Sequence, residues 1–134
     1  MAAYTVGQLA RLSGAGVETI RYYEREGLIA EPPRRPSGYR QYPEDALARL
    51  RFIRHAKALG FSLKDIKELL SLRVTPGTTC ADIRQRAEVK IVDIRAKIVM
   101  LRQMEQALVG LAASCHGDGP TSTCSILDAL EGDS

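Results

Sequence analysis

The feature that most constrains the fold is a long uninterrupted helical stretch in the C-terminal half. From Thr79 or Cys80 the chain contains neither glycine nor proline until Gly110, and the helical pattern extends to Ser114. Apolar side chains recur along it at alternating intervals of four and three, which is the heptad pattern of a coiled coil. This seam consists of Ala87, Ile91, Ile94, Ile98, Leu101, Glu105, Leu108 and Ala112, and only Glu105 interrupts its apolar character.

A lone helix of this length cannot bury such a seam, so the seam requires a partner helix. The preceding residues already supply short helices with apolar faces of their own. We therefore expect the partner to be the same helix of a second copy, in a homodimer. The alternative is a helix that folds back over its own N-terminal domain.

Residues 1–74 predict a small helical domain. Thr5 and Gln8 form a potential capping box at the start of a first helix, and a second helical pattern begins near Val17. Between them, the turn at 13–16 contains two glycines, so the pair is typical of a helix-turn-helix. Two further helices are predicted, one with Pro43 as its first residue and one capped by Ser62.

The positive charge of the chain lies in its N-terminal part. Residues 1–60 contain ten Lys and Arg against six Asp and Glu, whereas residues 61–134 contain nine against ten. Residues 31–40 contain three prolines and a glycine, so they cannot be helical and predict an extended or hairpin-like loop. This loop carries Arg34, Arg35, Tyr39 and Arg40, which favours contact with a phosphate backbone over the alternative of a solvated basic loop.

The three cysteines are expected to be reduced. The N-terminus lacks a charged-then-apolar leader, and no apolar run approaches the roughly 20 residues that span a bilayer, so we expect a cytoplasmic protein without a membrane partner. Cys80 and Cys115 stand at the two ends of the long helix, roughly 50 Å apart at the usual helical rise. One chain cannot bring both to the same ion.

An antiparallel dimer of the long helix would place Cys80 of one subunit beside Cys115 of the other. Cys124 follows nine residues later, after a loop with two glycines and a proline that can curl over an ion. The sequence thus predicts a three-thiolate site across the dimer, which selects soft ions such as Zn, Cd, Pb, Hg or Cu(I). His116 could add a nitrogen for tetrahedral Zn, although a solvated imidazole is the simpler interpretation.

Other classes of function have less support. The chain has no Ser/His/acid constellation and no Gly-rich phosphate loop, and its two histidines are His55 and His116, so we expect no enzyme. A thiol redox sensor that oxidises Cys115 and Cys124 to a disulfide is one alternative, although His116 is the only basic residue between these thiols. A structural helical adaptor that does not bind DNA is another.

The whole chain resembles the MerR family of metal-responsive transcription regulators. The resemblance rests on residues 4–10 (YTVGQLA), 18–29 (ETIRYYEREGLI), 38–42 (GYRQY) and 59–63 (LGFSL). It implies an all-α fold with a small β wing, in which a winged helix-turn-helix domain precedes a long antiparallel coiled-coil dimerisation helix. We expect the winged domain with its connecting helices in 1–74, the dimerisation helix in 79–114, and a metal-binding loop with a short helix in 115–134.

The resemblance also implies a mechanism and a set of DNA contacts. Family members bind double-stranded promoter DNA as homodimers, and metal binding distorts the DNA so that RNA polymerase can use the promoter. The helix from Val17 would be the recognition helix, with Tyr23 in the core. The DNA contacts would come from that helix and from the wing, through Thr19, Arg21, Tyr22, Arg34, Tyr39 and Arg40.

The metal ligands implied by the resemblance are Cys80, Cys115 and Cys124, as in the mercury-sensing branch. There, one subunit supplies one thiolate and its partner supplies two, and together they hold Hg(II) in a trigonal site. The Cys115-His116 pair fits that branch, and Ser114 stands where zinc sensors usually have a second cysteine. Ser125 after Cys124 is instead similar to the Zn, Cd and Pb group. Copper sensors fit poorly, and we expect Hg(II) in preference to Zn(II), Cd(II) or Pb(II).

Overall fold

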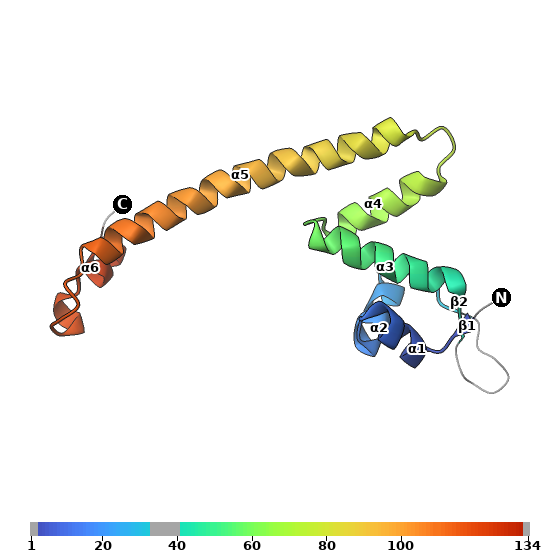
Figure 1. Ribbon diagram of the computed structural model, residues 1–134, viewed down its shortest axis with the longest axis horizontal. Helices are drawn as coiled ribbons and strands as arrows, with labels where there is room; N and C mark the ends of the chain where they lie inside the picture. Colours follow the sequence, from blue (N-terminus) through green and yellow to red (C-terminus); the bar gives the residue numbers. More distant parts are fainter. Residues whose placement is uncertain (1–2, 33–40, 133–134) are drawn as a thin grey trace. The chain divides into compact units, whose positions relative to one another are not determined.

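The computed structural model describes residues 3–32 and 41–132 and is mostly helical (Figure 1). By contacts, the chain divides into two units, Met1–Ile83 and Arg84–Ser134, which are described separately. The elements in chain order are β1 (Ala3–Tyr4), α1 (Val6–Ser13), α2 (Val17–Arg25), β2 (Tyr42–Pro43), α3 (Glu44–Ala58), α4 (Leu63–Val74), α5 (Cys80–Ala113), a 3-10 turn η1 (Thr121–Thr123) and α6 (Ser125–Glu131). The expected fold class is confirmed: helices dominate the described residues, in which two strands pair to form a sheet.

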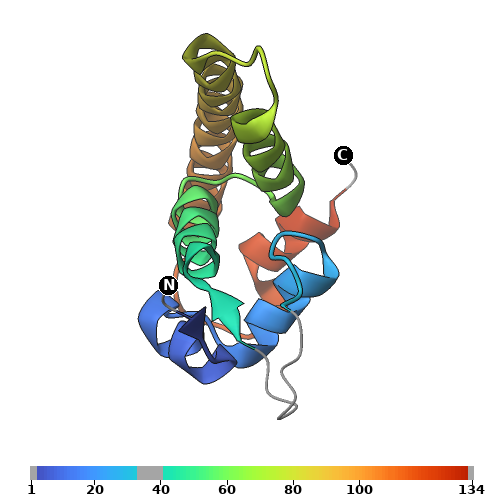
Figure 2. The ribbon, with the colours of Figure 1, turned by 90° about the vertical axis from the view of Figure 1, so that its right-hand side faces the viewer.

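The helix-turn-helix consists of α1 and α2, and α1 packs against both α2 and α3 (Figures 1 and 2). The predicted capping box is present. The Thr5 hydroxyl oxygen accepts a hydrogen bond from the Gln8 amide at 3.2 Å, and the Gln8 side-chain oxygen accepts one from the Thr5 amide at 2.9 Å. α1 ends because Gly14 adopts a φ of 78°, a left-handed conformation that glycine tolerates without steric cost.

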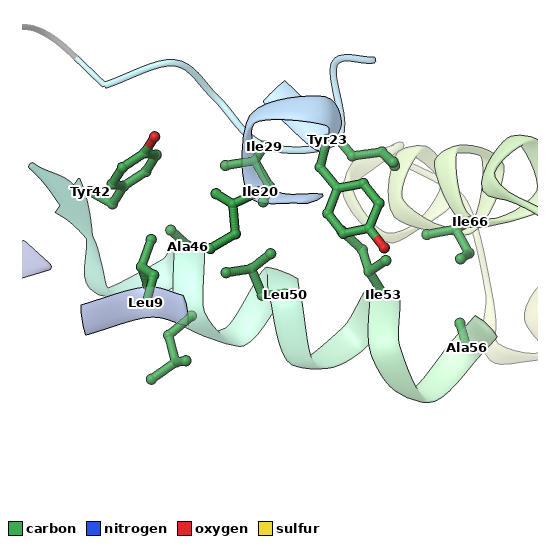
Figure 3. Close-up of a cluster of buried hydrophobic side chains, with 12 residues drawn as sticks. Leu9, Ile20, Tyr23, Ile29, Tyr42, Ala46, Leu50, Ile53, Ala56 and Ile66 are labelled. Atoms are coloured by element: carbon green, nitrogen blue, oxygen red, sulfur yellow. The ribbon is translucent and has the colours of Figure 1, made fainter. Parts of the chain in front are cut away.

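The hydrophobic core of this unit forms around α3. Leu47, Leu50 and Ile53 are buried, as their spacing predicts, and Leu50 and Ile53 point toward Ile20 and Tyr23 of α2 (Figure 3). α4 adds Ile66 and closes the core on the other side. The remaining buried members of the cluster are Leu9, Leu28, Ile29, Tyr42, Ala46 and Ala56.

A two-stranded antiparallel sheet joins the N-terminus to the start of α3. Ala3 pairs with Pro43 and Tyr4 pairs with Tyr42. Pro43 was expected as the first helical residue, but it lies in β2 and caps α3 from outside, with an extended ψ of 166°. The difference is one residue. It arises because the backbone φ that the proline ring imposes is compatible with both the end of a strand and the residue before a helix.

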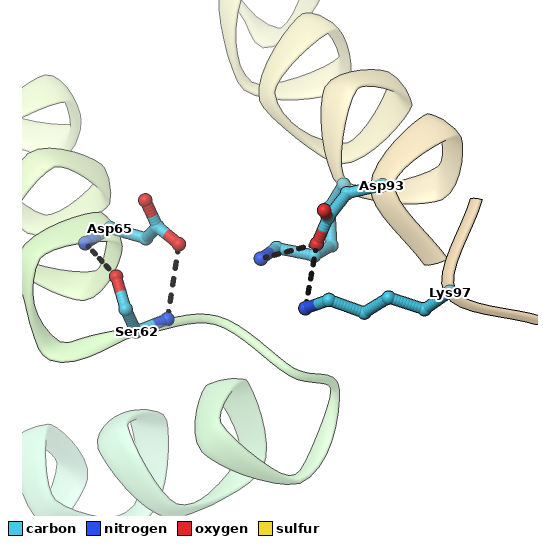
Figure 4. A network of polar contacts seen from close by, with 5 residues as sticks. Ser62, Asp65, Asp93 and Lys97 are labelled. Carbon is cyan, nitrogen blue, oxygen red and sulfur yellow. Dashed lines mark hydrogen bonds and ion pairs between the residues drawn. The ribbon is translucent and has the colours of Figure 1, made fainter. Parts of the chain in front are cut away.

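α4 begins as the sequence predicts, with Ser62 as its cap. The Ser62 hydroxyl accepts a hydrogen bond from the Asp65 amide at 3.1 Å, and the Asp65 carboxylate accepts one from the Ser62 amide at 3.0 Å (Figure 4). The serine cap was predicted from the sequence, but the reciprocal hydrogen bond of Asp65 was not. The helix ends at Val74, before the predicted break at Thr75–Gly77.

The second unit contains most of α5 and the short helix α6. α5 is a continuous helix of 34 residues, and none of its side chains is buried within the chain. α6 is attached to the end of α5 because the Ser125 hydroxyl donates a hydrogen bond to the Ser114 carbonyl oxygen at 3.1 Å, and the hydroxyl oxygens of Ser114 and Ser125 lie 3.0 Å apart, within hydrogen-bond distance. Among the described residues, no helix is long and apolar enough to cross a membrane.

Candidate DNA-binding surface and metal-ligating thiols

The predicted recognition helix, α2, is amphipathic. It turns Ile20 and Tyr23 into the core and leaves Thr19, Arg21 and Tyr22 on its exposed surface, where Tyr22 is 40% exposed. Since successive helical residues are rotated by about 100°, burial at 20 and 23 directs 21 and 22 away from the core, while the exposed Thr19 lies at the edge of the buried face. The Arg25 guanidinium lies 5.9 Å from the centre of the Tyr22 ring, a cation–π distance that sequence analysis did not anticipate.

The turn that positions α2 is held from α3 by Arg54. Its Nη1 donates a hydrogen bond to the carbonyl oxygen of Ser13 at 3.1 Å, and Ser13 is buried. A Cβ placed on Gly14 would lie 2.7 Å from the same Nη1, so only glycine leaves room for this guanidinium in its present position. The sequence does not indicate this role of Arg54, because nothing in the local pattern of α3 predicts a contact 41 residues away.

Other long-range polar contacts fix the C-terminal end of α2. The Arg49 Nη1 donates to the carbonyl oxygen of Leu28 at 3.1 Å, and the Tyr42 hydroxyl donates to the Glu24 carboxylate. The ammonium of Lys67 lies 3.6 Å from the Glu26 carboxylate. α2 is thus tied at its end to β2, α3 and α4, so its exposed face is presented by a rigid frame.

The predicted wing contacts Arg34, Tyr39 and Arg40 lie outside the described residues, as does Arg35. The described residues that flank this segment are fixed in the core. Leu28 and Ile29 are buried before it, and Tyr42 is buried after it. The described residues on both sides of this segment therefore belong to the core that carries α2.

The three cysteines occupy the places that the sequence predicts. Cys80 is the first residue of α5 and is exposed, Cys115 follows the end of that helix and is exposed, and Cys124 caps α6 and is half-buried. All three are free thiols. Within the described part of this single chain, no group of three or more His, Cys, Asp or Glu residues is placed to hold a metal ion.

The loop between Cys115 and Cys124 is locally ordered by its own backbone. Gly117 adopts a φ of 80°, and its amide donates to the Cys115 sulfur at 3.4 Å. A second glycine with positive φ, Gly119 at 92°, and the η1 turn bring the chain back to Cys124. These turns place Cys115 and Cys124 at the two ends of one locally ordered loop.

The donor set fits a soft metal ion. The candidate ligands are three thiols, of which two are exposed and one is half-buried, and all three offer sulfur as the ligating atom. Such ligands suit Hg(II), Cd(II), Pb(II) or Zn(II) and not the hard ions Mg²⁺ and Ca²⁺. His116 is exposed beside Cys115.

These features define a class of protein: a DNA-binding helix-turn-helix regulator with a long helix and thiol-bearing ends. Comparison with known families agrees, since residues 4–72 match the model of the MerR HTH family of regulatory proteins and residues 47–111 match the model described as MerR, DNA binding. The chain belongs to the MerR family. It is a transcription regulator and not an enzyme.

Similar proteins cover nearly the whole chain. It is 41% identical to the HTH-type transcriptional regulator ZntR of Escherichia coli K12, over 96% of this chain and 92% of that protein. It is 40% identical to the mercuric resistance operon regulatory protein of Pseudomonas fluorescens, over 96% and 88%. Among solved structures, the transcription regulator PbrR691 from Ralstonia metallidurans CH34 in complex with lead(II) gives a TM-score of 0.82 at 35% identity, covering 95% of this chain and 98% of that one.

Proposed function

We propose that this regulator is a homodimeric, metal-responsive activator whose effector is a soft metal ion, with Hg(II) as the preferred ion. The observation that carries this proposal is the placement of the thiols: Cys80 begins α5, while Cys115 and Cys124 enclose a loop at its other end. In this proposal, α5 pairs with the α5 helix of a second copy in antiparallel orientation. Thiols from both chains therefore lie close together at each end of the paired helices.

Each proposed metal site takes Cys80 from one chain and Cys115 and Cys124 from its partner. Three sulfur ligands match a trigonal Hg(II) site, and the similarity to a mercuric resistance regulator supports this ion. Zn(II), Cd(II) and Pb(II) are the alternatives, and the similarity to a lead(II) complex supports that group. His116, which is exposed beside Cys115, is a candidate fourth ligand only for a tetrahedral ion.

The proposed DNA surface combines α2 with the wing. Thr19, Arg21 and Tyr22 would enter the major groove, and Arg34, Tyr39 and Arg40 would contact phosphates. A dimer presents two such surfaces to one promoter. With the ion bound, the dimer distorts the promoter DNA so that RNA polymerase can transcribe the resistance genes.

Metal titration of the reduced protein tests the site. We expect Hg(II) to produce thiolate-to-metal charge-transfer absorption and to induce a reporter more strongly than Zn(II), Cd(II) or Pb(II). Cys80→Ser, Cys115→Ser and Cys124→Ser should each abolish induction and leave DNA binding nearly intact, while Ser122→Ala in the same loop serves as the matched control. Normal induction in any one of the cysteine variants would remove that sulfur from the ligand set.

A salt-titrated DNA-binding assay tests the proposed DNA surface. Arg40→Ala should weaken binding to all sequences and reduce the logarithmic salt slope by about 1, whereas Arg21→Ala should also change the site preference. Arg73, on the surface of α4, provides a matched Arg→Ala control. If both variants bind as the unmodified protein does across the salt range, this surface does not contact DNA.

A thiol redox sensor is the second candidate, because Cys115 and Cys124 lie at the ends of one loop in the same chain. Oxidation would join these two sulfurs in a disulfide and would not require Cys80. The Cys80→Ser variant therefore separates the two functions: a redox sensor keeps its response to oxidant in this variant, whereas a metal sensor loses its response to metal.

A further inference from the structure

α5 presents an apolar face that the described chain leaves uncovered. All eight seam residues are exposed, and the seam isoleucines Ile91, Ile94 and Ile98 are 44%, 39% and 40% exposed. Toward its C-terminal end this face is formed by Leu101, Met104, Glu105, Leu108, Val109 and Ala112, so one carboxylate lies in an otherwise apolar surface.

The spacing of the seam residues favours a second copy of α5 as the partner helix. Its intervals read four, three, four, three, four, three, four in both directions, with the centre between Val99 and Met100. A second copy of α5 running in the opposite direction therefore matches the seam position for position. The layers pair Ile98 with Leu101, Ile94 with Glu105, Ile91 with Leu108, and Ala87 with Ala112.

Charge complementarity points to the same orientation. Residues 86–99 carry four Lys and Arg against two Asp and Glu, whereas residues 100–113 carry one Arg and one Glu. Antiparallel pairing places the cationic half of each helix against the nearly neutral half of the other. Parallel pairing would instead place the two cationic halves side by side, where they repel.

Glu105 distinguishes the two orientations most strongly. It occupies the heptad position that faces its own counterpart in a parallel dimer, so two carboxylates would meet in an apolar interface. In the antiparallel dimer Glu105 faces Ile94, and the flanking positions are Arg102 on its own helix and Arg95 of the partner subunit. Within the described chain Glu105 has no ion pair or hydrogen bond, so its carboxylate is available to these cations.

We propose that Glu105 is the residue that specifies antiparallel pairing of α5, by making the parallel dimer unfavourable. A polar residue at one seam position lowers dimer stability and fixes orientation, which is a known use of such residues in coiled coils. This inference rests on the proposed antiparallel homodimer and adds the residue that selects it. In the same register, Cys80 lies about 9 Å further along the helix axis than the partner's Ala113. This displacement is directed toward the loop of the partner subunit that contains the other two thiols.

Disulfide mapping in the full-length chain tests the proposal. The parent carries Cys80→Ser, Cys115→Ser and Cys124→Ser together with Ile91→Cys and Leu108→Cys, and is compared with the same chain bearing Glu105→Leu. After mild oxidation and trypsin digestion, the two introduced cysteines lie on different peptides, so mass spectrometry separates 91–108 links from 91–91 and 108–108 links.

We expect the parent to form 91–108 links between chains, in roughly tenfold or greater excess over the other two kinds. Glu105→Leu should bring the 91–91 and 108–108 links to comparable yield and lower the dissociation constant of the dimer. Gln103→Leu, which adds the same side chain away from the seam, should keep the pattern of the parent. Glu105→Gln should give an intermediate pattern, because it removes the charge but keeps a polar group.

The outcomes separate the two claims. If Glu105→Leu retains only 91–108 links, Glu105 does not specify orientation, while the antiparallel dimer stands. If the parent itself gives 91–91 and 108–108 links, or no link at all, the antiparallel register is wrong and the proposed intersubunit metal site fails with it.

Discussion

The two units of this chain differ in where their apolar side chains find partners. In the N-terminal unit, α1, α2, α3 and α4 bury a common core within one chain, and Ile20, Ile53 and Ile66 are fully enclosed. In the second unit, α5 is longer than any of these helices and buries none of its residues. The difference indicates that one copy of the chain completes the core of the N-terminal unit, whereas the apolar face of α5 requires a partner helix.

A charged residue introduced into the seam should give the largest effect. It should dissociate the partner helix from α5 and leave the core of the N-terminal unit intact. Ile98→Asp should yield a monomer in sedimentation experiments and weaken promoter binding by about a hundredfold or more, since two linked DNA-binding surfaces become one. Val99→Asp, at a neighbouring exposed position off the seam, should remain dimeric. An Ile98→Asp protein that stays dimeric would show that the seam is not the interface.

Two glycine substitutions should move stability in opposite directions in the two units. Gly14→Ala should lower the free energy of unfolding by about 1–2 kcal/mol, because a φ of 78° is strained for alanine and its Cβ would displace the Arg54 guanidinium. Gly110→Ala in α5 should raise it by about 0.5–1 kcal/mol, because alanine favours helix and a Cβ there meets nothing within 4 Å. Urea denaturation measures both, and changes of the same sign would contradict the comparison.

Removal of the Asp93 ion pairs on α5 should give the smallest effect. The Asp93 carboxylate lies 3.0 Å from the Lys97 ammonium and 3.6 Å from that of Lys90 (Figure 4). The hydrogen bond from Lys97 and the charges of both lysines lower the pKa of Asp93 below its ordinary value of 3.8. A lowered carboxyl pKa contributes stability above the ordinary value, and the contribution is lost as pH falls through the lowered one.

Asp93→Asn should therefore reduce Tm at pH 7 by only about 1 °C or less, since the pair is solvent-exposed. The difference from the unmodified protein should shrink as the pH is lowered through the titration of Asp93. Asp118→Asn, in the loop after α5, is the matched control and should show no such trend. A larger loss at acidic pH than at pH 7 would contradict the assigned direction.

The sequence predicted the local parts of this fold well. Capping residues, glycines and apolar spacing are local signals. α1 therefore begins and ends close to where Thr5 and Gly14 indicate, and α4 close to where Ser62 and Thr75 indicate. α2 and α5 likewise begin at the expected Val17 and Cys80. The pattern also separated Tyr23 in the core from Tyr22 on the surface. The start of α3 was misplaced by one residue, because Pro43 is compatible with both the end of a strand and the entry to a helix.

Contacts between distant elements were not predictable in the same way. Arg49 and Arg54 look like ordinary surface arginines of α3, yet they hold backbone carbonyls of Leu28 and Ser13. The pairing of Tyr42 with Glu24 likewise spans 18 residues. Such contacts depend on which helices pack together, and that information is absent from helical periodicity.

The central claim is that a complete metal site contains thiols from two chains, and mixed dimers test it most directly. One chain carries Cys80→Ser and the other carries both Cys115→Ser and Cys124→Ser, so neither homodimer retains three thiols at any site. We predict that the mixed dimer binds one Hg(II) in the presence of an excess competing thiol, with three-sulfur charge-transfer absorption absent from both homodimers. A mixed dimer that binds no better than the two parents would contradict the account.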